Sequence, residues 1–140
     1  MKKHYFFIFL FLPVLLTAQV LPITSTEPLD LSAYGETTTY PGEGEYQIFL
    51  SADNTLDKPI ILVDGFDPGD TRNIAGLYSS LDFNGDAGAQ NLADLVRAEG
   101  FDVVVLNFPI YTRAADGAIV DGGADFMERN AMILVELINF

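Results

Sequence analysis

The stretch that most constrains this chain is an apolar run that ends abruptly in turn-forming residues. The five residues 59–63 read Pro-Ile-Ile-Leu-Val, without polar alternation. Such a run predicts a strand covered on both faces, as found inside parallel sheets. The next six residues, 64–69, read Asp-Gly-Phe-Asp-Pro-Gly and cannot continue a strand. Because open α/β sheets bind ligands beyond the carboxyl ends of their strands, a functional site is expected at this turn.

The first 18 residues have the three-part layout of a secretory signal. The chain starts Met-Lys-Lys-His, a short basic head, and residues 6–16 form an apolar run of 11 residues. We therefore expect a signal peptide over residues 1–18, cleaved near Ala18-Gln19, and a protein secreted from a bacterial cell. The apolar run is too short for a stable membrane span, which needs about 20 apolar residues.

The remaining part, residues 19–140, is strongly acidic. It keeps five of the seven basic residues and all 20 acidic residues, so its formal net charge is −15. Such a surface repels nucleic acid and anionic membranes, and we expect neither as a partner. The chain has no cysteine, which excludes disulfides, thiolate metal sites and a lipid-anchored lipoprotein.

The first half of residues 19–140 predicts an edge hairpin. Residues 19–36 show no period and are expected to be an irregular lead-in. Threonine-rich and aromatic residues at 37–40 and 45–51 flank Pro-Gly-Glu-Gly, which favours an antiparallel hairpin near the edge of a sheet.

Two helices are predicted after the strand at 59–63. Apolar spacing predicts a short amphipathic helix over 74–81. A second helix is expected after a loop at 82–86, with Asp86 as its cap and Gly100 at its end. Its buried stripe is expected to be Leu92, Leu95 and Val96.

The acidic loop at 82–86 leaves one question open. Its spacing matches the first ligands of a calcium loop, but the turn glycine and the bidentate glutamate of such loops are missing. A loop with a helix cap is the favoured interpretation, and calcium binding stays undecided.

The last third predicts a second buried strand and a final helix. Residues 102–108 are apolar and β-branched, and the strand–helix–strand order makes this strand parallel to 59–63. A long loop over 109–123 is expected to lead to a capping-box start at Asp125. The final helix is apolar on most of its circumference, so we expect it to pack on a sheet.

Arg129 and Asn130 in the first turn of that helix could contact a ligand, but we interpret them as a solvated pair. The expected fold class is therefore α/β: an edge hairpin, then parallel strands joined by crossover helices.

Three segments resemble the α/β-hydrolase superfamily in its lipase and esterase branch. Residues 60–66, Ile-Ile-Leu-Val-Asp-Gly-Phe, resemble the strand and oxyanion turn, where the family has His-Gly followed by a large apolar residue. Residues 101–108 resemble the next strand, and residues 124–131 resemble the helix leading toward the nucleophile strand. The likeness covers about residues 45–140, with Asp64 standing where the family usually has histidine.

The resemblance implies a secreted hydrolase acting on a small-molecule or lipid ester without a cofactor. The backbone N–H of Phe66 would be an oxyanion donor, supported by Gly65, and such a donor contributes about 3 kcal/mol. Asp64 and Asp67 would shape the turn, and Tyr111, just past the second strand, would belong to the substrate pocket.

The remaining catalytic groups are missing from residues 19–140. The family's nucleophile lies in Gly-x-Ser-x-Gly after the next strand, with an acid and a histidine further along. No serine here has that setting, and the only histidine is His4, inside the predicted signal peptide. We therefore expect the amino-terminal part of one α/β-hydrolase-like domain, truncated before the nucleophile strand, with no metal site and no activity alone.

Two alternatives remain. The chain could be an exported acidic binding or interaction module without catalysis, since long loops on a rigid scaffold suit that role. Less favoured is a Mg²⁺-dependent phosphatase, because Asp64 and Asp67 resemble the paired aspartates of haloacid dehalogenase-like phosphatases with one extra residue between them.

Overall fold

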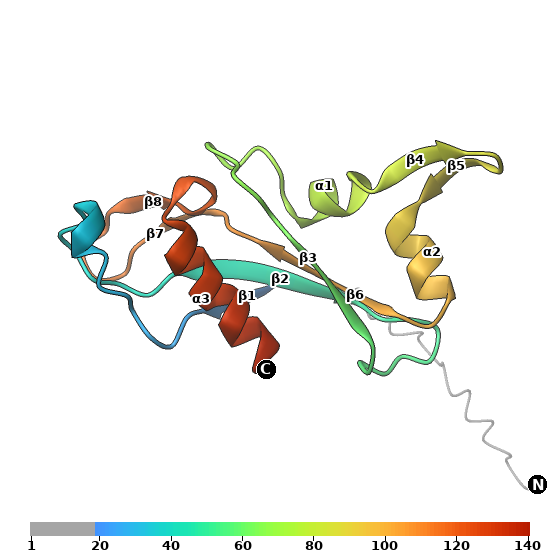
Figure 1. Cartoon of the computed structure of the whole chain (residues 1–140), viewed down its shortest axis with the longest axis horizontal. Coiled ribbons are helices and arrows are strands. Elements are labelled where there is room, and N and C mark those ends of the chain that lie inside the picture. Colours follow the sequence, from blue (N-terminus) through green and yellow to red (C-terminus); the bar gives the residue numbers. More distant parts are fainter. Residues whose placement is uncertain (1–18) are drawn as a thin grey trace, which may run out of the picture.

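The computed structural model describes residues 19–140, and the predicted signal peptide lies outside the described residues. At the centre is a four-stranded mixed sheet (Figure 1). The strands, in spatial order, are β1 (Leu21–Thr24), β2 (Glu43–Phe49), β6 (Asp102–Asn107) and β3 (Pro59–Val63). β2 runs antiparallel to both of its neighbours, and β3 runs parallel to β6, as predicted. The chain is thus a mixed α/β structure.

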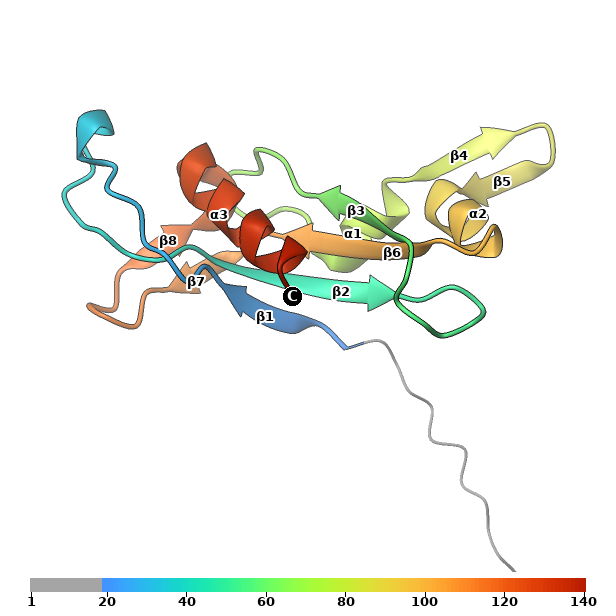
Figure 2. The same cartoon turned by 60° about the horizontal axis from the view of Figure 1, so that its bottom comes forward.

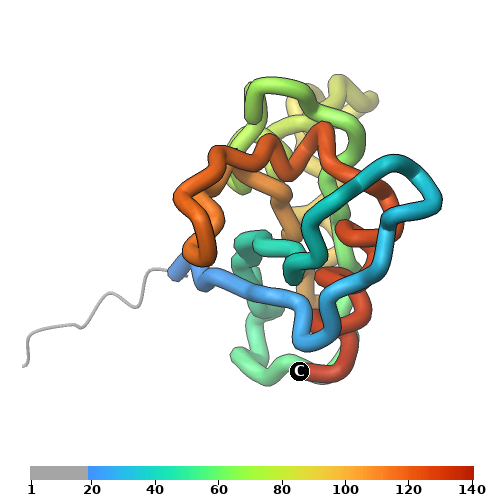
Figure 3. Tube along the Cα trace, turned by 90° about the vertical axis from the view of Figure 1, so that its left-hand side faces the viewer, coloured from blue at the N-terminus to red at the C-terminus, as the bar shows by residue number. Residues whose placement is uncertain are grey.

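Three α-helices cover the two faces of this sheet (Figures 2 and 3). They are α1 (Ile74–Ser79), α2 (Leu92–Ala98) and α3 (Met127–Ile138), close to the helices predicted from apolar spacing. α1 and α2 lie in the connection between β3 and β6 and pack on β6, whereas α3 packs on β1 and β2 from the opposite face. No helix in residues 19–140 is long and apolar enough to cross a membrane.

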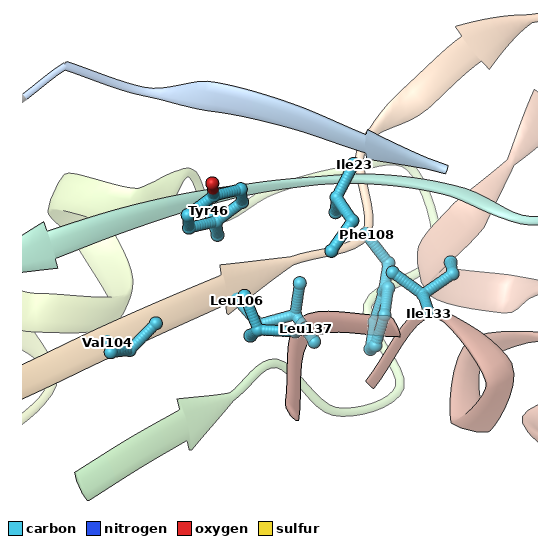
Figure 4. Packing of buried hydrophobic residues seen from close by; sticks show 7 residues of the cluster. All are labelled: Ile23, Tyr46, Val104, Leu106, Phe108, Ile133 and Leu137. Atoms are coloured by element: carbon cyan, nitrogen blue, oxygen red, sulfur yellow. The ribbon is translucent and has the colours of Figure 1, made fainter. Parts of the chain in front are cut away.

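Alternate side chains of β6 enter two separate cores. Val104 and Leu106 point toward α3, whereas Val103 and Val105 point toward α1 and α2. The core under α3 is drawn in Figure 4 and consists of Ile23, Tyr46, Val104, Leu106, Phe108, Ile133 and Leu137. The core under α1 and α2 consists of Ile74, Leu77, Ala93, Val103 and Val105. β6 is therefore the strand that is buried on both faces.

β3 differs from its prediction because it is an edge strand of the described sheet. Ile60 and Val63 are 41% and 37% exposed, so its apolar run is not covered on both sides. The continuous apolar pattern of 59–63 correctly predicted a parallel strand but not its place in the sheet.

The prediction that residues 37–40 form the first strand of a hairpin is wrong. β2 pairs with β1, with Leu21 opposite Tyr46, and β1 lies inside the segment expected to be irregular. Residues 37–40 form no strand, and the amides of the first two donate to a side chain instead. The Glu36 carboxylate accepts hydrogen bonds from the amides of Thr37 and Thr38, at 2.9 and 3.0 Å.

Two of the expected loops are small hairpins. β4 (Asp82–Gly85) pairs with β5 (Gly88–Asn91), so residues 82–86 are mostly strand. β7 (Ile110–Thr112) pairs with β8 (Ile119–Asp121) inside the expected loop 109–123. Two 3-10 helices complete the elements, η1 (Ser32–Tyr34) and η2 (Gly122–Ala124).

The structure of α2 corrects two further predictions, its cap and its buried stripe, and confirms one, its end. Asn91, and not Asp86, caps α2 by accepting from the amides of Ala93 and Asp94. Gly100 ends α2 at φ +88°, as predicted. The expected stripe of α2 is only partly right: Val96 packs into the core, whereas Leu92 and Leu95 are 49% and 39% exposed.

The capping box predicted for α3 is absent. Phe126 occupies the N-cap position and makes no side-chain hydrogen bond to the helix. Asp125 lies one residue earlier, where its carboxylate accepts from the Phe126 amide at 2.8 Å and pairs with Arg129.

Candidate functional site

The turn after β3 leaves the sheet one residue past the strand. The amide of Asp64 still donates to the carbonyl of Leu106 at 2.9 Å, which extends the parallel ladder. Residues 64–67 then continue without a turn, and the chain first turns at Pro68-Gly69. At Gly65, no atom beyond its two chain neighbours lies within 4 Å of where a Cβ would be. The backbone at Gly65 is therefore open to a ligand, because glycine presents no side chain there.

The neighbouring segment fixes the far side of this turn. The amide of Asp67 donates to the carbonyl of Gly123 in η2 at 3.0 Å. A Cβ at Gly123 would lie 2.5 Å from the Asp67 carbonyl oxygen, so only glycine permits this approach. Asn130 of α3 supports η2 by donating its Nδ2 to the carbonyl of Gly122 at 2.9 Å.

Residues 67–70 form a Pro-Gly turn of the expected kind. The amide of Asp70 donates to the carbonyl of Asp67 at 3.1 Å, and Gly69 has φ +84°. The Gly69 amide donates to the Asp121 carboxylate at 2.7 Å. The Ile110 amide donates to the Asp70 carboxylate at 3.2 Å, so both strands of the β7–β8 hairpin hold this turn in place.

The carboxyl group of Asp64 is buried, with 1% of its side chain exposed. Its Oδ1 accepts from the Gly65 amide at 2.9 Å and lies 3.0 Å from Nη2 of Arg72. Its Oδ2 is buried and has no hydrogen-bond partner within residues 19–140. Burial raises the pKa of Asp64, and the Gly65 amide and the Arg72 guanidinium oppose that rise.

Asp67 has a supporting role in the turn. One carboxylate oxygen accepts from the Thr71 hydroxyl at 2.5 Å, and the other accepts from the Arg72 amide at 2.8 Å. The Thr71 hydroxyl is the main reason that the pKa of Asp67 is lowered. These contacts tie Asp67 to the segment that follows it, and its side chain does not line the pocket described next.

A pocket of about 280 Å³ lies between this turn and α3. It is lined by Val63, Asp64, Gly65, Phe66, Phe108, Gly123, Asp125, Met127, Asn130, Ala131 and Leu134. Most of these side chains are apolar, and three carry polar groups. The predicted residues Asp64, Gly65 and Phe66 are thus brought together, and α3 adds a wall that the sequence analysis did not predict.

The amide of Phe66 donates no hydrogen bond within the part of the chain that the structure describes. Its side chain is 80% exposed, and its carbonyl accepts from Arg72 Nη2 at 3.4 Å. An uncommitted N–H beside an apolar pocket can stabilise negative charge that develops on a ligand oxygen.

Arg129 is the clearest error of the sequence analysis at this end of the molecule. It was interpreted as solvated, but only 1% of it is exposed. Its guanidinium pairs with Asp125, lies 3.6 Å from the ring centroid of Tyr40 and donates to the Tyr40 hydroxyl at 2.6 Å. The four-residue spacing of Asp125 and Arg129 was the available signal, although Asp125 lies before the N-cap of α3 and reaches Arg129 from outside the helix.

Tyr111 is not brought to the pocket. It lies on β7, and its hydroxyl is buried without a partner in residues 19–140. Burial raises its pKa, and the charges that act on it most are Asp125, Tyr40 and Arg129. Tyr111 is therefore not among the residues that line this pocket, and its surroundings are those of the buried arginine.

The described residues offer no ready metal site. Within 19–140 no group of three or more acidic or histidine side chains could hold a metal ion. Asp64 and Asp67 both lie against the Arg72 guanidinium, at 3.0 and 3.4 Å, where a cation shared by the two carboxylates would have to bind. This contact does not favour the phosphatase alternative.

None of the five serines of the chain lines the pocket. Ser79 and Ser80 donate their hydroxyls to main-chain carbonyls of α1, and Ser51 donates to Asp53. The arrangement therefore supplies a main-chain donor, a buried carboxyl group and an apolar wall, but no activated nucleophile.

Comparisons of the chain with protein-family models, with curated proteins and with solved structures found no match.

Proposed function

We propose that residues 19–140 are the amino-terminal part of a secreted α/β-hydrolase-like domain whose complete form hydrolyses carboxylic esters or lipids. One observation carries this proposal. The amide of Phe66 lies at the carboxyl end of β3, beside an apolar pocket, and has no partner within the described residues. A donor of this kind is what acyl transfer needs, because charge develops on the carbonyl oxygen.

The sheet around the turn supports the proposal. β3 and β6 are parallel, and helices pack on both faces of the sheet beside them. In open α/β sheets the crevice beyond the carboxyl ends of such strands is where ligands bind. Gly65 and Phe66 lie at that end, just before the Pro68-Gly69 turn.

The open edge of β3 supports it further. Edge strands that expose apolar side chains offer unpaired main-chain groups to another strand, and Ile60 and Val63 are both exposed. A strand added there in parallel would end beside the pocket. The resemblance to the hydrolase superfamily requires the nucleophile at that position, which residues 19–140 do not supply.

The first test is activity. Purified residues 19–140 are expected to release no p-nitrophenol from p-nitrophenyl esters above the rate of a heat-denatured sample, because no Ser-His pair can form. Measurable hydrolysis by the chain alone would contradict the assignment of the nucleophile to another segment.

The second test is the coding sequence beyond codon 140. A strand followed by Gly-x-Ser-x-Gly within about 30 residues supports the hydrolase. An immediate stop codon supports the binding module without catalysis.

In a complete hydrolase, Phe66→Pro removes the N–H and should lower kcat by about 10²–10³-fold. Phe66→Ala keeps the N–H and serves as the matched control, with kcat expected within a few-fold of the wild type. Equal loss in both variants would argue against a main-chain role.

A further inference from the structure

The peptide group that carries the Phe66 amide lies between two peptide groups that are held by hydrogen bonds. The preceding group is held through the Gly65 amide, which donates to the Asp64 carboxylate at 2.9 Å. The following group is held at both ends. Its carbonyl, that of Phe66, accepts from Arg72 Nη2 at 3.4 Å, and its amide, that of Asp67, donates to a main-chain carbonyl of η2 at 3.0 Å.

One side chain, that of Arg72, contacts both of these neighbouring groups. Its Nη2 lies 3.0 Å from Asp64 Oδ1, the oxygen that also accepts from the Gly65 amide. The same nitrogen donates to the Phe66 carbonyl, and Nε lies 3.4 Å from Asp67 Oδ2. The guanidinium therefore contacts the chain on both sides of the Phe66 amide. The sequence analysis did not identify this residue.

The main chain at Arg72 is itself fixed. Its amide donates to the Asp67 carboxylate at 2.8 Å. The next residue, Asn73, is the N-cap of α1 and accepts from a main-chain amide of that helix at 2.8 Å. α1 in turn buries Ile74 and Leu77 in the core that it shares with β6. The guanidinium thus reaches residues 64–67 from a segment that is anchored in the core.

The shape of the guanidinium matters as well as its charge. Arginine presents its donors in a rigid planar fork, so two of its nitrogens can face different acceptors at once. A lysine ammonium would keep the positive charge beside Asp64 and Asp67. It is a single nitrogen on a flexible stem, however, and would not replace the contacts that Nη2 and Nε make together.

We propose that Arg72 is a positioning residue that fixes the orientation of the Phe66 amide beside the pocket by holding the peptide groups on either side of it. Neither the Gly65 carbonyl nor the Phe66 amide has a hydrogen-bond partner within residues 19–140. The orientation of this peptide group therefore depends on its neighbours. The importance of that orientation for catalysis rests on the proposed function of the Phe66 amide.

The experiment measures the mobility of the Phe66 N–H by ¹⁵N relaxation in labelled residues 19–140. In the wild type its order parameter should be about 0.85, the value of a rigid backbone, although residues 64–67 form no helix or strand. In Arg72→Lys and Arg72→Gln it should fall below about 0.6, or relaxation dispersion should detect slower exchange at this amide. The amides of β3 should stay rigid in both variants.

Arg97→Lys is the matched control. Arg97 also holds a main-chain carbonyl, that of Leu50, at 3.0 and 2.8 Å, and it pairs with Asp94 at 3.4 Å. It lies on α2 and does not line the pocket. The control should keep the Phe66 amide rigid, which separates positioning from a general loss of stability.

Two results would overturn the inference. A rigid Phe66 amide in Arg72→Lys would mean that the positive charge alone is sufficient. A mobile Phe66 amide in the wild type would mean that Arg72 does not fix it. The second result needs no variant, so the inference stays falsifiable if Arg72→Gln does not fold.

Kinetics of a complete hydrolase separate this inference from the proposed function. There Arg72→Lys should lower kcat for p-nitrophenyl acetate about tenfold, part of the roughly 10²–10³-fold cost of losing an oxyanion donor, with KM within about twofold of the wild type. If the variant frees the Phe66 amide but leaves kcat unchanged, the positioning role stands and the oxyanion role of Phe66 fails. If the amide stays rigid in the variant, the positioning role fails and the oxyanion role stands.

Discussion

The two ends of the parallel β3–β6 pair each bury an aspartate, and they surround it differently. Asp102 begins β6 and is fully buried. Its Oδ1 accepts from the Ser51 amide at 2.9 Å, and its Oδ2 accepts from the amides of Asp57 and Lys58 at 3.0 and 3.2 Å. These amides lower the pKa of Asp102, the Ser51 amide most of all. At the other end, Asp64 keeps an unpartnered oxygen and a raised pKa.

The difference separates a structural carboxylate from a candidate functional one. A carboxylate that accepts several main-chain bonds fixes the segments that donate them, since each donor would otherwise be buried unpaired. Asp102 joins the segment after β2 to the segment before β3 in this way. Asp64 has partners on one oxygen only, and its other oxygen is buried without a partner within residues 19–140.

The largest expected effect is the loss of stability when Asp102 is truncated, compared with the smaller loss when Asp64 is truncated. Asp102→Ala leaves three amides without their acceptor and should lower the free energy of unfolding by about 3–5 kcal/mol. Asp64→Ala removes one amide contact and a half-exposed ion pair, and should cost about 1 kcal/mol. Urea denaturation measures both. Asp86→Ala, at an exposed hairpin turn, is the control and should change stability by less than about 0.5 kcal/mol. Equal losses at 64 and 102 would remove the distinction.

A smaller effect tests whether η2 holds the segment that follows β3 in place. Gly123→Ala would place a methyl group 2.5 Å from the Asp67 carbonyl oxygen and should cost about 2 kcal/mol while shifting the Phe66 amide resonance. Gly65→Ala meets nothing within 4 Å and is the matched control, expected within about 0.5 kcal/mol of the wild type. If Gly123→Ala is as stable as Gly65→Ala, η2 does not hold the turn.

The smallest effect is the pH dependence of stability. The pKa of Asp102 is lowered by folding, so its contribution is present above about pH 4, the unfolded pKa, and is lost as pH falls through the folded pKa. The pKa of Asp64 is raised, so its contribution is present below about pH 4 and is lost as pH rises through the folded pKa. The charges that face Asp64 are Arg72, Asp67 and Asp70, with Asp125 across the pocket.

This sign difference is measured by unfolding the wild type, Asp102→Asn and Asp64→Asn between pH 3 and pH 7. The stability difference between wild type and variant should rise with pH for Asp102→Asn and fall with pH for Asp64→Asn. Parallel curves would show that the two carboxyl groups respond alike.

Sequence periodicity predicted the elements that contribute most to the cores. The two parallel strands and three helices carry long apolar patterns, and each was found close to its expected residues. The hairpins were missed because their strands are short and mostly polar or small, as in β5, Gly-Ala-Gln-Asn. Residues 37–40 were assigned to a strand because threonine and tyrosine favour one, yet the Glu36 side chain accepts from the amides of Thr37 and Thr38.

The candidate site was predictable only in its local part. Asp64, Gly65 and Phe66 adjoin one another in the chain, and turn chemistry alone places them at the strand end. Gly123 and Asn130 reach the site through contacts between distant segments, which no local pattern encodes. The neighbours of Tyr111 could not be predicted for the same reason, because they depend on how the β7–β8 hairpin folds.

Both faces of β6 carry apolar side chains, and this affects how its register with the neighbouring strands is fixed. Sliding it by one residue would exchange its two faces without exposing a polar side chain from its middle. Only its ends resist such a slip: Asp102, with its three amides, and Asn107, whose Nδ2 donates to Glu45 Oε1 at 3.0 Å. A single apolar residue inserted between Asp102 and Asn107 would keep β6 apolar but would move these two side chains one residue further apart. The end of β3 would then lie opposite a different residue of β6.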